Sequence, residues 1–597
     1  MDKPQGTRRR KARRRVMVLL VLCCAVFALF LARLAWLQFA MADHYAQKMA
    51  EASSASYTLP QHAARGAITD RSGTVLAQDE TVYDVYLRVP APPGTNLRET
   101  VNTIAALTGG KDVETQLAAF CSAVSAGELP VTQGLDNIGA AAYYRAGLVQ
   151  SGAVRLAARG VRRWPDGTIL PHTLGFTGPI TAEQWPAAMA QGLAMDATIG
   201  QNGLEAAYDT LLRGRDGQLQ INVGLDGVTR ETVQTSTPVP GCTLVLTLDA
   251  DLQKTLQTAL QNQMDTLRTT KGIGAGREVR AGAAVVVDVR TGGILAAASL
   301  PDFDLSRYRS DYAALSADSA APLLDRVCQG LYAPGSAFKP AVAAAALTAG
   351  IDPAATVNCT GKYFYYSNYH PGCLQYGHRG PVDLRTALEY SCNIFFYDTG
   401  RRLGVDTFSA MARQLGLAND TGVEITAAQG RLTWSTDTNY QDGLTLMAAI
   451  GQGNTAVTPL QLAQYAAALA NYGRKPTLHF ADRAVQPATG AAVWQYEPAF
   501  TEIPGGEAVF GPIRDGMKRM AQTARALREA PVTVAAKTGS PQLADTLPGG
   551  SHYVNSVLIG YAPADDPQIA MAVVLEYGGG GANAAPVMRA VLDAWFE

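Results

Sequence analysis

With 597 residues, the chain is too long for one ordinary hydrophobic core and is expected to form two or three domains. It is 47% hydrophobic and 17% charged, a composition typical of globular proteins. Its formal net charge of -1 gives no electrostatic reason to expect nucleic acid as a partner.

The N-terminal segment is predicted to anchor the chain in a membrane. A basic cluster from Arg8 to Arg15 precedes an uncharged apolar run from Val16 to Ala32, which covers about 25 Å as a helix. The positive-inside rule places residues 1–15 in the cytoplasm, residues 16–40 in the membrane and the rest outside, as in a single-pass protein of a bacterial cytoplasmic membrane. A signal peptide cleaved near Ala42 is the alternative, but the apolar run is longer than the usual signal peptide requires.

Residues 41–240 are predicted to form a mixed, irregular module that acts as a pedestal. The Arg65–Ala77 segment suggests two strands around a turn, and the Ala-rich spacing of 98–160 suggests a small helical insert. The other expected elements are a helix over 200–212 and strands over 217–223 and 242–247.

A boundary near Pro240 opens the second domain, residues 241–597. Strands, a large helical block, further strands and a closing helix indicate an α+β domain with one antiparallel sheet and helices on its faces. The expected elements are a helix over 248–267, strands over 283–288 and 294–298, helices within 338–475, strands over 532–536, 556–561 and 568–575, and a helix over 584–595.

A serine and a lysine one helical turn apart are the first candidate for chemistry. Ser336 follows Pro334-Gly335 at the predicted start of a helix, and Lys339 lies on the same face within reach of it. A serine hydroxyl needs a neighbouring base, and a lysine whose pKa is lowered by burial can serve. A helix cap with a solvated lysine is the bland alternative, because S-x-x-K is expected about once by chance in a chain of this length.

Two later motifs make a coincidence improbable. Ser391-Cys392-Asn393 lies at the end of a buried helical stretch and offers a hydroxyl and an amide. Lys537-Thr538-Gly539-Ser540 follows the strand predicted over 532–536 and supplies a cation, two hydroxyls and a glycine that permits close approach.

With these three motifs in this order, the chain resembles the class B penicillin-binding proteins, monofunctional D,D-transpeptidases of peptidoglycan synthesis. The resemblance covers nearly the whole region outside the anchor, although Ser540 and Ala536 stand where threonine and glycine are more usual. It implies the serine-transpeptidase fold, with a five-stranded antiparallel sheet on a pedestal or dimerisation module. It also implies peptidoglycan stem peptides as substrate, β-lactams as inhibitors, and a membrane glycan polymerase of the cell-wall synthesis complex as partner.

The resemblance also implies a role for each motif residue. Ser336 attacks the penultimate D-Ala carbonyl of a pentapeptide stem, Lys339 is the base, and Ser391 relays a proton to the leaving group. Asn393 and the 537–540 segment hold the donor, with Lys537, Thr538 and Ser540 near its carboxylate. Backbone N–H groups of Ser336 and Ser540 form the oxyanion hole, and no cofactor is required.

Four potential metal ligands fall close together in the sequence. Three thiols and one imidazole suit a tetrahedral structural zinc ion, although the spacing is not that of a standard zinc finger. The alternatives are a Cys359–Cys373 disulfide with a buried third thiol, and an ordinary surface histidine. The residues are Cys359, Cys373, His378 and Cys392.

Three other functions remain open from the residues. A β-lactam hydrolase shares these motifs but needs a further carboxylate base, for which no local signature is visible. A D,D-carboxypeptidase differs only in using water as acceptor. A non-catalytic β-lactam sensor usually requires an intracellular effector, and fifteen cytoplasmic residues are too few to hold one.

Overall fold

The computed structural model describes residues 6–51, 53–89, 92, 94–109, 112–123, 127–195, 197–224, 229–373, 378–548 and 550–597. Two compact units are present, and each is described by itself. The first comprises Met1–Ala63 with Arg215–Val239, and the second comprises Ala64–Gly214 with Pro240–Glu597.

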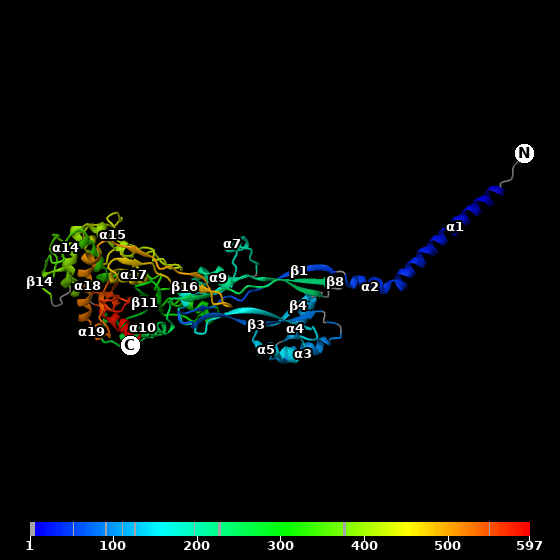
Figure 1. Cartoon of the computed structure of the whole chain (residues 1–597), viewed down its shortest axis with the longest axis horizontal. Helices are drawn as coiled ribbons and strands as arrows, with labels where there is room; N and C mark the ends of the chain where they lie inside the picture. Colours follow the sequence, from blue (N-terminus) through cyan, green and yellow to red (C-terminus); the bar gives the residue numbers. More distant parts are fainter. Residues whose placement is uncertain are drawn as a thin grey trace. The chain divides into compact units, whose positions relative to one another are not determined.

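The first unit contains a long N-terminal helix and a small sheet (Figure 1). Arg10–Ala40 is long and apolar enough to cross a membrane, and no second helix in the described part of the chain passes the same test. The Arg33 guanidinium lies 4.3 Å from the centroid of the Trp36 ring, near the end of this stretch. The elements are α1 (Gly6–Ala35), a π-helical turn (Trp36–Ala40), α2 (Ala42–Glu51), and the antiparallel strands β1 (Ser53–Gln61), β8 (Gly217–Gly224) and β9 (Thr229–Ser236).

The predicted helical insert over 98–160 is wrong in part, because two strands lie within or extend from it. One of these strands pairs along nearly its whole length with β3 (Val75–Val89), so the sheet, and not helix packing, organises this segment. Its helices pack on buried residues of β3 such as Val85 and Leu87. The elements are α3 (Leu97–Leu107), α4 (Val113–Ala123), β4 (Gly127–Leu135), α5 (Asn137–Arg145) and β5 (Val154–Arg163).

The sheet that contains β3 also takes strands from later in the chain. Its order is β17-β16-β10-β2-β3-β4, with β5 paired to β3, so strands from either side of residue 240 share one sheet. The added strands are β2 (Ile68–Thr69), β10 (Thr243–Leu246), β16 (Ala481–Val485) and β17 (Ala492–Gln495). Short elements between them are α6 (Pro171–Leu174), β6 (Thr177–Pro179), α7 (Trp185–Ala190), β7 (Thr198–Gly200), α8 (Gly203–Ala207) and α9 (Asp209–Arg213).

A five-stranded antiparallel sheet forms the centre of the C-terminal region, which confirms the predicted fold. Its order is β12-β11-β23-β22-β19. The strands are β11 (Gly282–Asp288), β12 (Ile294–Leu300), β19 (Ala535–Gly539), β22 (Ser556–Ala562) and β23 (Ile569–Leu575).

Helices cover both faces of this sheet, as its uniformly apolar strands predict. Successive residues of a strand point to opposite faces. Val285 and Val287 therefore belong to one core cluster, whereas Ala284 and Val286 belong to the other. The second cluster includes α10 (Ala250–Arg268) and α20 (Ala585–Phe596), and α17 (Pro459–Ala470) packs in the first.

The strand that carries the third motif begins later than predicted. Val532 to Val534 are not paired, and β19 pairs with β22 from Ala535 to Gly539. Lys537, Thr538 and Gly539 are thus part of the strand and do not follow it. An apolar run alone does not show which of its residues meet the neighbouring strand.

The remaining elements all belong to the second unit. They are α11 (Tyr308–Ala317), α12 (Lys339–Thr348), β13 (Val357–Cys359), β14 (Gly380–Val382), α13 (Leu384–Glu389), α14 (Asn393–Leu403), α15 (Val405–Gln414), α16 (Asp442–Ala449), β15 (Arg474–Pro476), β18 (Phe500–Glu502), α18 (Gly506–Thr523), α19 (Arg525–Arg528), β20 (Gln542–Thr546) and β21 (His552–Val554). Single 3-10 turns occupy Leu305–Arg307, Gly335–Phe338 and Gly581–Ala584.

Candidate active site

The first motif lies where a 3-10 turn passes into a helix. Ser336 is in the turn Gly335–Phe338 and is partly exposed, whereas Lys339 begins α12 and is fully buried. Pro340 is tolerated because it occupies the first turn of α12, where its missing N–H leaves no hydrogen bond unmade. Ser336 is therefore partly accessible to solvent, while the lysine one turn on is withdrawn from it.

The buried ammonium group of Lys339 is directed at the second motif. Its Nζ donates to the Ser391 carbonyl oxygen at 2.8 Å, to Ser391 Oγ at 3.1 Å and to Asn393 Oδ1 at 2.6 Å. Burial lowers the pKa of Lys339 to about 7, against the opposing effect of the neighbouring Cys392 and Cys373. Among the described residues, its hydrogen bonds go to Ser391 and Asn393 and not to Ser336.

Ser391 holds a backbone conformation that is rare for a residue with a side chain. Its φ is +57°, in the left-handed region, between the end of α13 and the start of α14. The surrounding hydrogen bonds impose this conformation, since Cys392 N donates to the Ala387 carbonyl at 2.9 Å. The turn presents both the carbonyl and the hydroxyl of Ser391 to Lys339.

A second buried lysine reaches the same hydroxyl from the sheet. Lys537 Nζ donates to Ser391 Oγ at 3.0 Å and to the Thr538 carbonyl at 3.1 Å. Lys537 is fully buried, and desolvation together with the charge of Lys339 holds its pKa well below the usual value. Because the amines of Lys339 and Lys537 share one hydroxyl, a positive charge on both is unfavourable. This repulsion promotes a neutral lysine at neutral pH.

Gly539 allows the third motif to lie directly against the first. A Cβ atom at this position would be 2.3 Å from the Pro334 carbonyl oxygen, a contact that no real side chain makes. Beyond it, the exposed Ser540 accepts a hydrogen bond from Gly581 N at 2.9 Å through its hydroxyl. The structure thus brings Ser336, Lys339, Ser391, Asn393 and Lys537–Ser540 to one site.

A carboxylate that the sequence reasoning missed supports the loop before Ser336. Glu576 Oε1 accepts hydrogen bonds from Tyr332 Oη at 2.7 Å and from Arg326 Nε at 2.9 Å. Tyr332 and Arg326 are buried, and Glu576 directly follows the apolar strand β23. A lone acidic residue at the end of an apolar strand is the only sequence signal for this contact.

The four predicted metal ligands gather in one buried cluster. The ligand atoms of Cys359, Cys373, His378 and Cys392 all lie within 4.8 Å of one another. The sulfur atoms of Cys373 and Cys392 are 4.0 Å apart, close to the separation of about 3.8 Å that two thiolates have on a tetrahedral zinc ion. All four residues are buried, and the cysteines are free thiols, so the structure contains no Cys359–Cys373 disulfide.

The surroundings of Cys373 favour its thiolate form. Hydrogen bonds from the Cys392 thiol, Asn393 N and His378 lower the pKa of Cys373 against the effect of burial. Asn393 N is 3.3 Å from the Cys373 sulfur, so the cluster is directly attached to the second motif. Thiolates are the form in which cysteines bind zinc.

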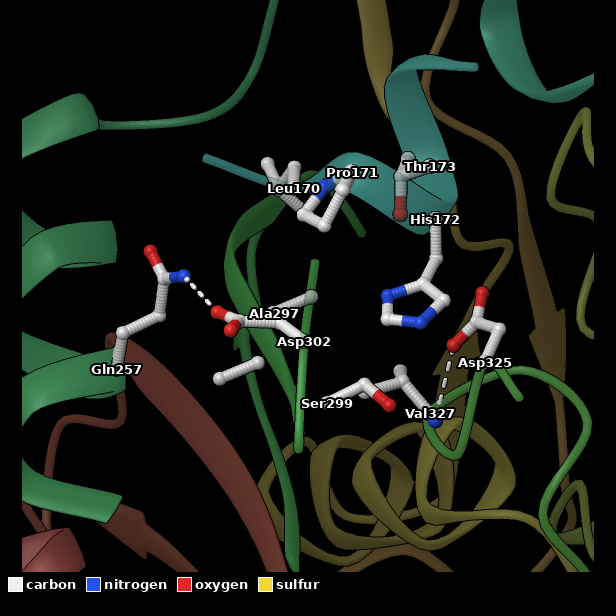
Figure 2. Close-up of a pocket in the computed structure, with 11 residues that line it drawn as sticks. Leu170, Pro171, His172, Thr173, Gln257, Ala297, Ser299, Asp302, Asp325 and Val327 are labelled. Atoms are coloured by element: carbon white, nitrogen blue, oxygen red, sulfur yellow. Dashed lines mark hydrogen bonds between the residues drawn. The ribbon is translucent and has the colours of Figure 1, made fainter. Parts of the chain in front are cut away.

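A cavity elsewhere in the second unit is too small to hold a substrate (Figure 2). Its volume is about 10 Å³, roughly that of one water molecule. Figure 2 shows Gln257 directed at Asp302, with the His172 ring on the opposite side. Burial raises the pKa of the Asp302 carboxyl, but the cavity includes none of the motif residues.

Two family models match the chain. Residues 282–593 match the penicillin-binding protein transpeptidase domain, and residues 60–246 match the penicillin-binding protein dimerisation domain. Among curated relatives, a peptidoglycan D,D-transpeptidase MrdA of Acinetobacter baumannii is 29% identical over 96% of this chain and 86% of that protein. The Escherichia coli K12 protein of the same name is 27% identical over 90% of this chain and 87% of its own length.

Solved structures of similar fold are also found. One belongs to a study of polymerization and crosslinking by a peptidoglycan synthase complex; its chain matches with a TM-score of 0.73, 29% identity and 98% coverage of both chains. Another is penicillin-binding protein PBP2 of Helicobacter pylori in complex with MreC, with a TM-score of 0.73, 22% identity and coverage of 91% and 99%.

Proposed function

The chain belongs to the family of penicillin-binding protein transpeptidases, and on that premise we propose that Ser336 is the nucleophile with which it cross-links peptidoglycan stem peptides. The observation that carries the proposal is the convergence of Lys339 and Lys537 on Ser391 Oγ, beside Ser336. This arrangement places groups that accept and donate protons one helical turn from the partly exposed Ser336 hydroxyl.

In the acylation step, Ser336 Oγ attacks the carbonyl carbon of the penultimate D-Ala. Neutral Lys339 takes the hydroxyl proton, and the new C–O bond forms as charge builds on the carbonyl oxygen. Backbone N–H groups of Ser336 and Ser540 stabilise that oxyanion. The C–N bond to the terminal D-Ala then breaks, and the released amine takes a proton through Ser391 Oγ, which already contacts both lysines.

In the second step, an amine from a neighbouring stem attacks the Ser336 ester. Its proton returns through Ser391 to Lys339 and then to Ser336 Oγ, so the serine is regenerated and the peptide bond is the cross-link. Asn393, Thr538 and Ser540 hold the donor, and Lys537 lies near its carboxylate. β-Lactams acylate the same oxygen because they resemble the donor.

The contacts of the two lysines favour transfer to an amine over rapid hydrolysis. A β-lactam hydrolase needs a carboxylate base for deacylation. The hydrogen-bond partners of Lys339 and Lys537 are hydroxyl, amide and carbonyl oxygens, with no carboxylate among the described residues.

The proposal is tested by incubating the purified protein with a pentapeptide stem donor and a free D-amino acid. Exchange of the terminal D-Ala for the added amino acid is expected, and Ser336→Ala should abolish it. Release of D-Ala without exchange would instead identify a carboxypeptidase.

We propose a structural zinc ion in addition, bound by Cys359, Cys373, His378 and Cys392. The size of the cluster, its burial and the thiolate character of Cys373 support this assignment. An ion there would fix the turn that carries Ser391 and Asn393, because Cys392 lies between them. It would take no part in acyl transfer.

The location and the partners of the chain are the remaining proposals. The basic cluster before the single apolar helix supports an N-terminus in the cytoplasm and a catalytic region outside it. The similarity to a chain studied in a peptidoglycan synthase complex supports pairing with a membrane glycan polymerase.

A further inference from the structure

A segment beside the second motif is unusually rich in aromatic residues. Five of the seven residues from Tyr363 to Tyr369 are Tyr or Phe, in the sequence YFYYSNY, whereas aromatic residues make up 8% of the chain. None of residues 363–370 carries a formal charge with histidine neutral. Neither the fold nor the reaction described above accounts for this composition.

The segment forms the tip of a hairpin, Gly361–Cys373, here called the aromatic hairpin. Tyr363 N donates to the Pro371 carbonyl at 3.0 Å, and Cys373 N donates to the Gly361 carbonyl at 2.9 Å. At its base, Asn393 Nδ2 donates to the Gly372 carbonyl at 3.2 Å. Asn393, which also accepts a hydrogen bond from Lys339, therefore connects the hairpin to the active site.

One aromatic side chain, Tyr363, anchors the hairpin to α14, and a second, Tyr365, stacks on an arginine of the same helix. Tyr363 is buried, and its hydroxyl donates to Asp398 Oδ1 at 3.0 Å and accepts from Arg401 Nε at 2.9 Å. The Arg401 guanidinium also lies 3.9 Å from the centroid of the Tyr365 ring. Both partners belong to α14, the helix that begins at Asn393, so the hairpin and the second motif share one support.

Three of the four remaining rings are exposed to solvent, whereas Tyr366 is partly buried against the main core. Phe364 is 63% exposed, Tyr365 58% and Tyr369 38%. Large exposed aromatic groups that gather on a fixed support indicate a binding surface, because their exposure to water is unfavourable. Tyrosine suits such a surface, since its ring is apolar and its hydroxyl forms hydrogen bonds.

We propose that the aromatic hairpin binds the glycan strand to which the stem peptide is attached, an inference that rests on the proposed function. Sugar rings present apolar C–H faces that stack on aromatic rings, and their hydroxyl and acetamido groups bond with tyrosine hydroxyls. The absence of charge from the tip suits these neutral sugars better than the carboxylates and amines of the stem. A glycan must accompany the stem to this site, because the two are covalently joined.

The dimensions of the hairpin fit this assignment. The reacting carbonyl is on the fourth stem residue, so an extended stem separates it from the sugar by about 14 Å. From its base at Gly361 and Cys373 to its tip, the hairpin spans five or six residues, at most about 20 Å if fully extended. Stem and hairpin therefore have comparable reach from the active site.

The experiment compares full-length wild-type protein with the double variant Phe364→Ala/Tyr365→Ala and with Tyr365→Phe. Two substrates are used: uncross-linked glycan strands that carry pentapeptide stems, and the free pentapeptide with a D-amino acid. Binding of a tetramer of N-acetylglucosamine is measured by titration calorimetry. Tyr144→Ala is the matched control, because Tyr144 is 50% exposed in α5, outside the active site.

The double variant is expected to lose about tenfold or more in cross-linking of glycan strands and in affinity for the tetramer, since two stacking rings are removed. Exchange on the free pentapeptide and penicillin acylation should stay within about twofold of wild type. Tyr365→Phe keeps the ring and should retain most of the affinity, and Tyr144→Ala should behave as wild type.

Three results would overturn the proposal. One is unchanged cross-linking of glycan strands by the double variant, and another is no binding of the tetramer to wild type. The third is an equal loss on both substrates, which would assign the hairpin a purely structural role. Failure of the wild type to react with penicillin would contradict the proposed function instead, so the two failures are distinguishable.

Discussion

Lys339 is buried beside the hydroxyl and the amide of the second motif, and this environment determines its charge. Desolvation disfavours the ammonium form and lowers the pKa to about 7, so the amine is substantially neutral at physiological pH. Only the neutral amine can accept the proton of Ser336. The acylation mechanism therefore makes a prediction about pH.

The rate of acylation by a fluorescent penicillin should increase with pH and level off above about 7. The neutral fraction of Lys339 falls about tenfold for each pH unit below its pKa, so the rate should fall in the same proportion. Lys339→Arg keeps a positive charge and should react at least about a hundredfold more slowly at every pH. A wild-type profile that is flat between pH 5.5 and 8.5 would show that another group is the base.

Glu576 is a positioning residue that acts through Tyr332, four residues before the nucleophile. Its carboxylate also balances the charge of Arg326, whose side chain is 4% exposed. Glu576→Gln leaves that charge buried with a weaker partner, which should reduce the free energy of unfolding by about 1–3 kcal/mol.

Glu576→Gln should also loosen the loop before Ser336 and slow acylation of that serine by penicillin. The pH at which the rate levels off should change little. Stopped-flow acylation and urea denaturation provide the two readouts. Glu502→Gln is the control, because Glu502 pairs with Arg474 at the surface, where such a pair contributes about 0–1 kcal/mol. The positioning role is wrong if Glu576→Gln acylates as fast as this control.

At the scale of elements, the register of β19 against the loop before Ser336 determines the width of the site. Gly539→Ala would place a methyl group 2.3 Å from the Pro334 carbonyl oxygen, and a backbone atom cannot give way at small cost. We expect the strand and the loop to separate, with penicillin acylation reduced about a hundredfold or more.

Gly580→Ala is the matched control for this substitution. Gly580 has a φ of -63° and no atom within 4 Å of an added Cβ, so alanine fits there without strain. If both variants are acylated at the wild-type rate, the close contact between β19 and the loop is not needed for catalysis.

The Cys/His cluster connects the aromatic hairpin with the helix that begins at Asn393. Purified protein should contain about one zinc ion per chain, and Cys373→Ser should lose it together with thermal stability. Cys242→Ser is the control, because Cys242 is a half-buried free thiol outside the cluster. Equal, substoichiometric zinc in wild type and Cys373→Ser would remove the zinc proposal.

The order of elements was largely predictable from the sequence, because apolar runs, turn residues and helical spacing are local signals. The position of Lys537 within β19, the strands within 98–160, and the pairing of β16 with β10 were not. Each of these depends on which distant segment a strand meets, and no local pattern encodes that choice.

The same distinction applies to the site. The motif residues could be found because three short polar motifs follow one another in a known order, each placed on a predicted helix or strand. The contact between Tyr332 and Glu576 spans 244 positions of sequence, and the left-handed backbone of Ser391 depends on surrounding hydrogen bonds. The compact Cys/His cluster lies between these cases, since a shared zinc site, a disulfide and a surface histidine all fitted its spacing.

At the scale of the whole molecule, the chain combines an N-terminal apolar helix, a pedestal with a shared sheet, and a transpeptidase domain. All the motif residues lie in the last of these. The account of the molecule nevertheless depends on the reactivity of a single oxygen atom.

Mass spectrometry of the full-length protein after reaction with benzylpenicillin tests that reactivity most directly. One covalent penicilloyl group is expected, located at Ser336 in the peptide map and absent from Ser336→Ala. A correctly folded wild-type protein that carries no adduct, or carries it on another residue, would contradict the assignment of Ser336 as the nucleophile.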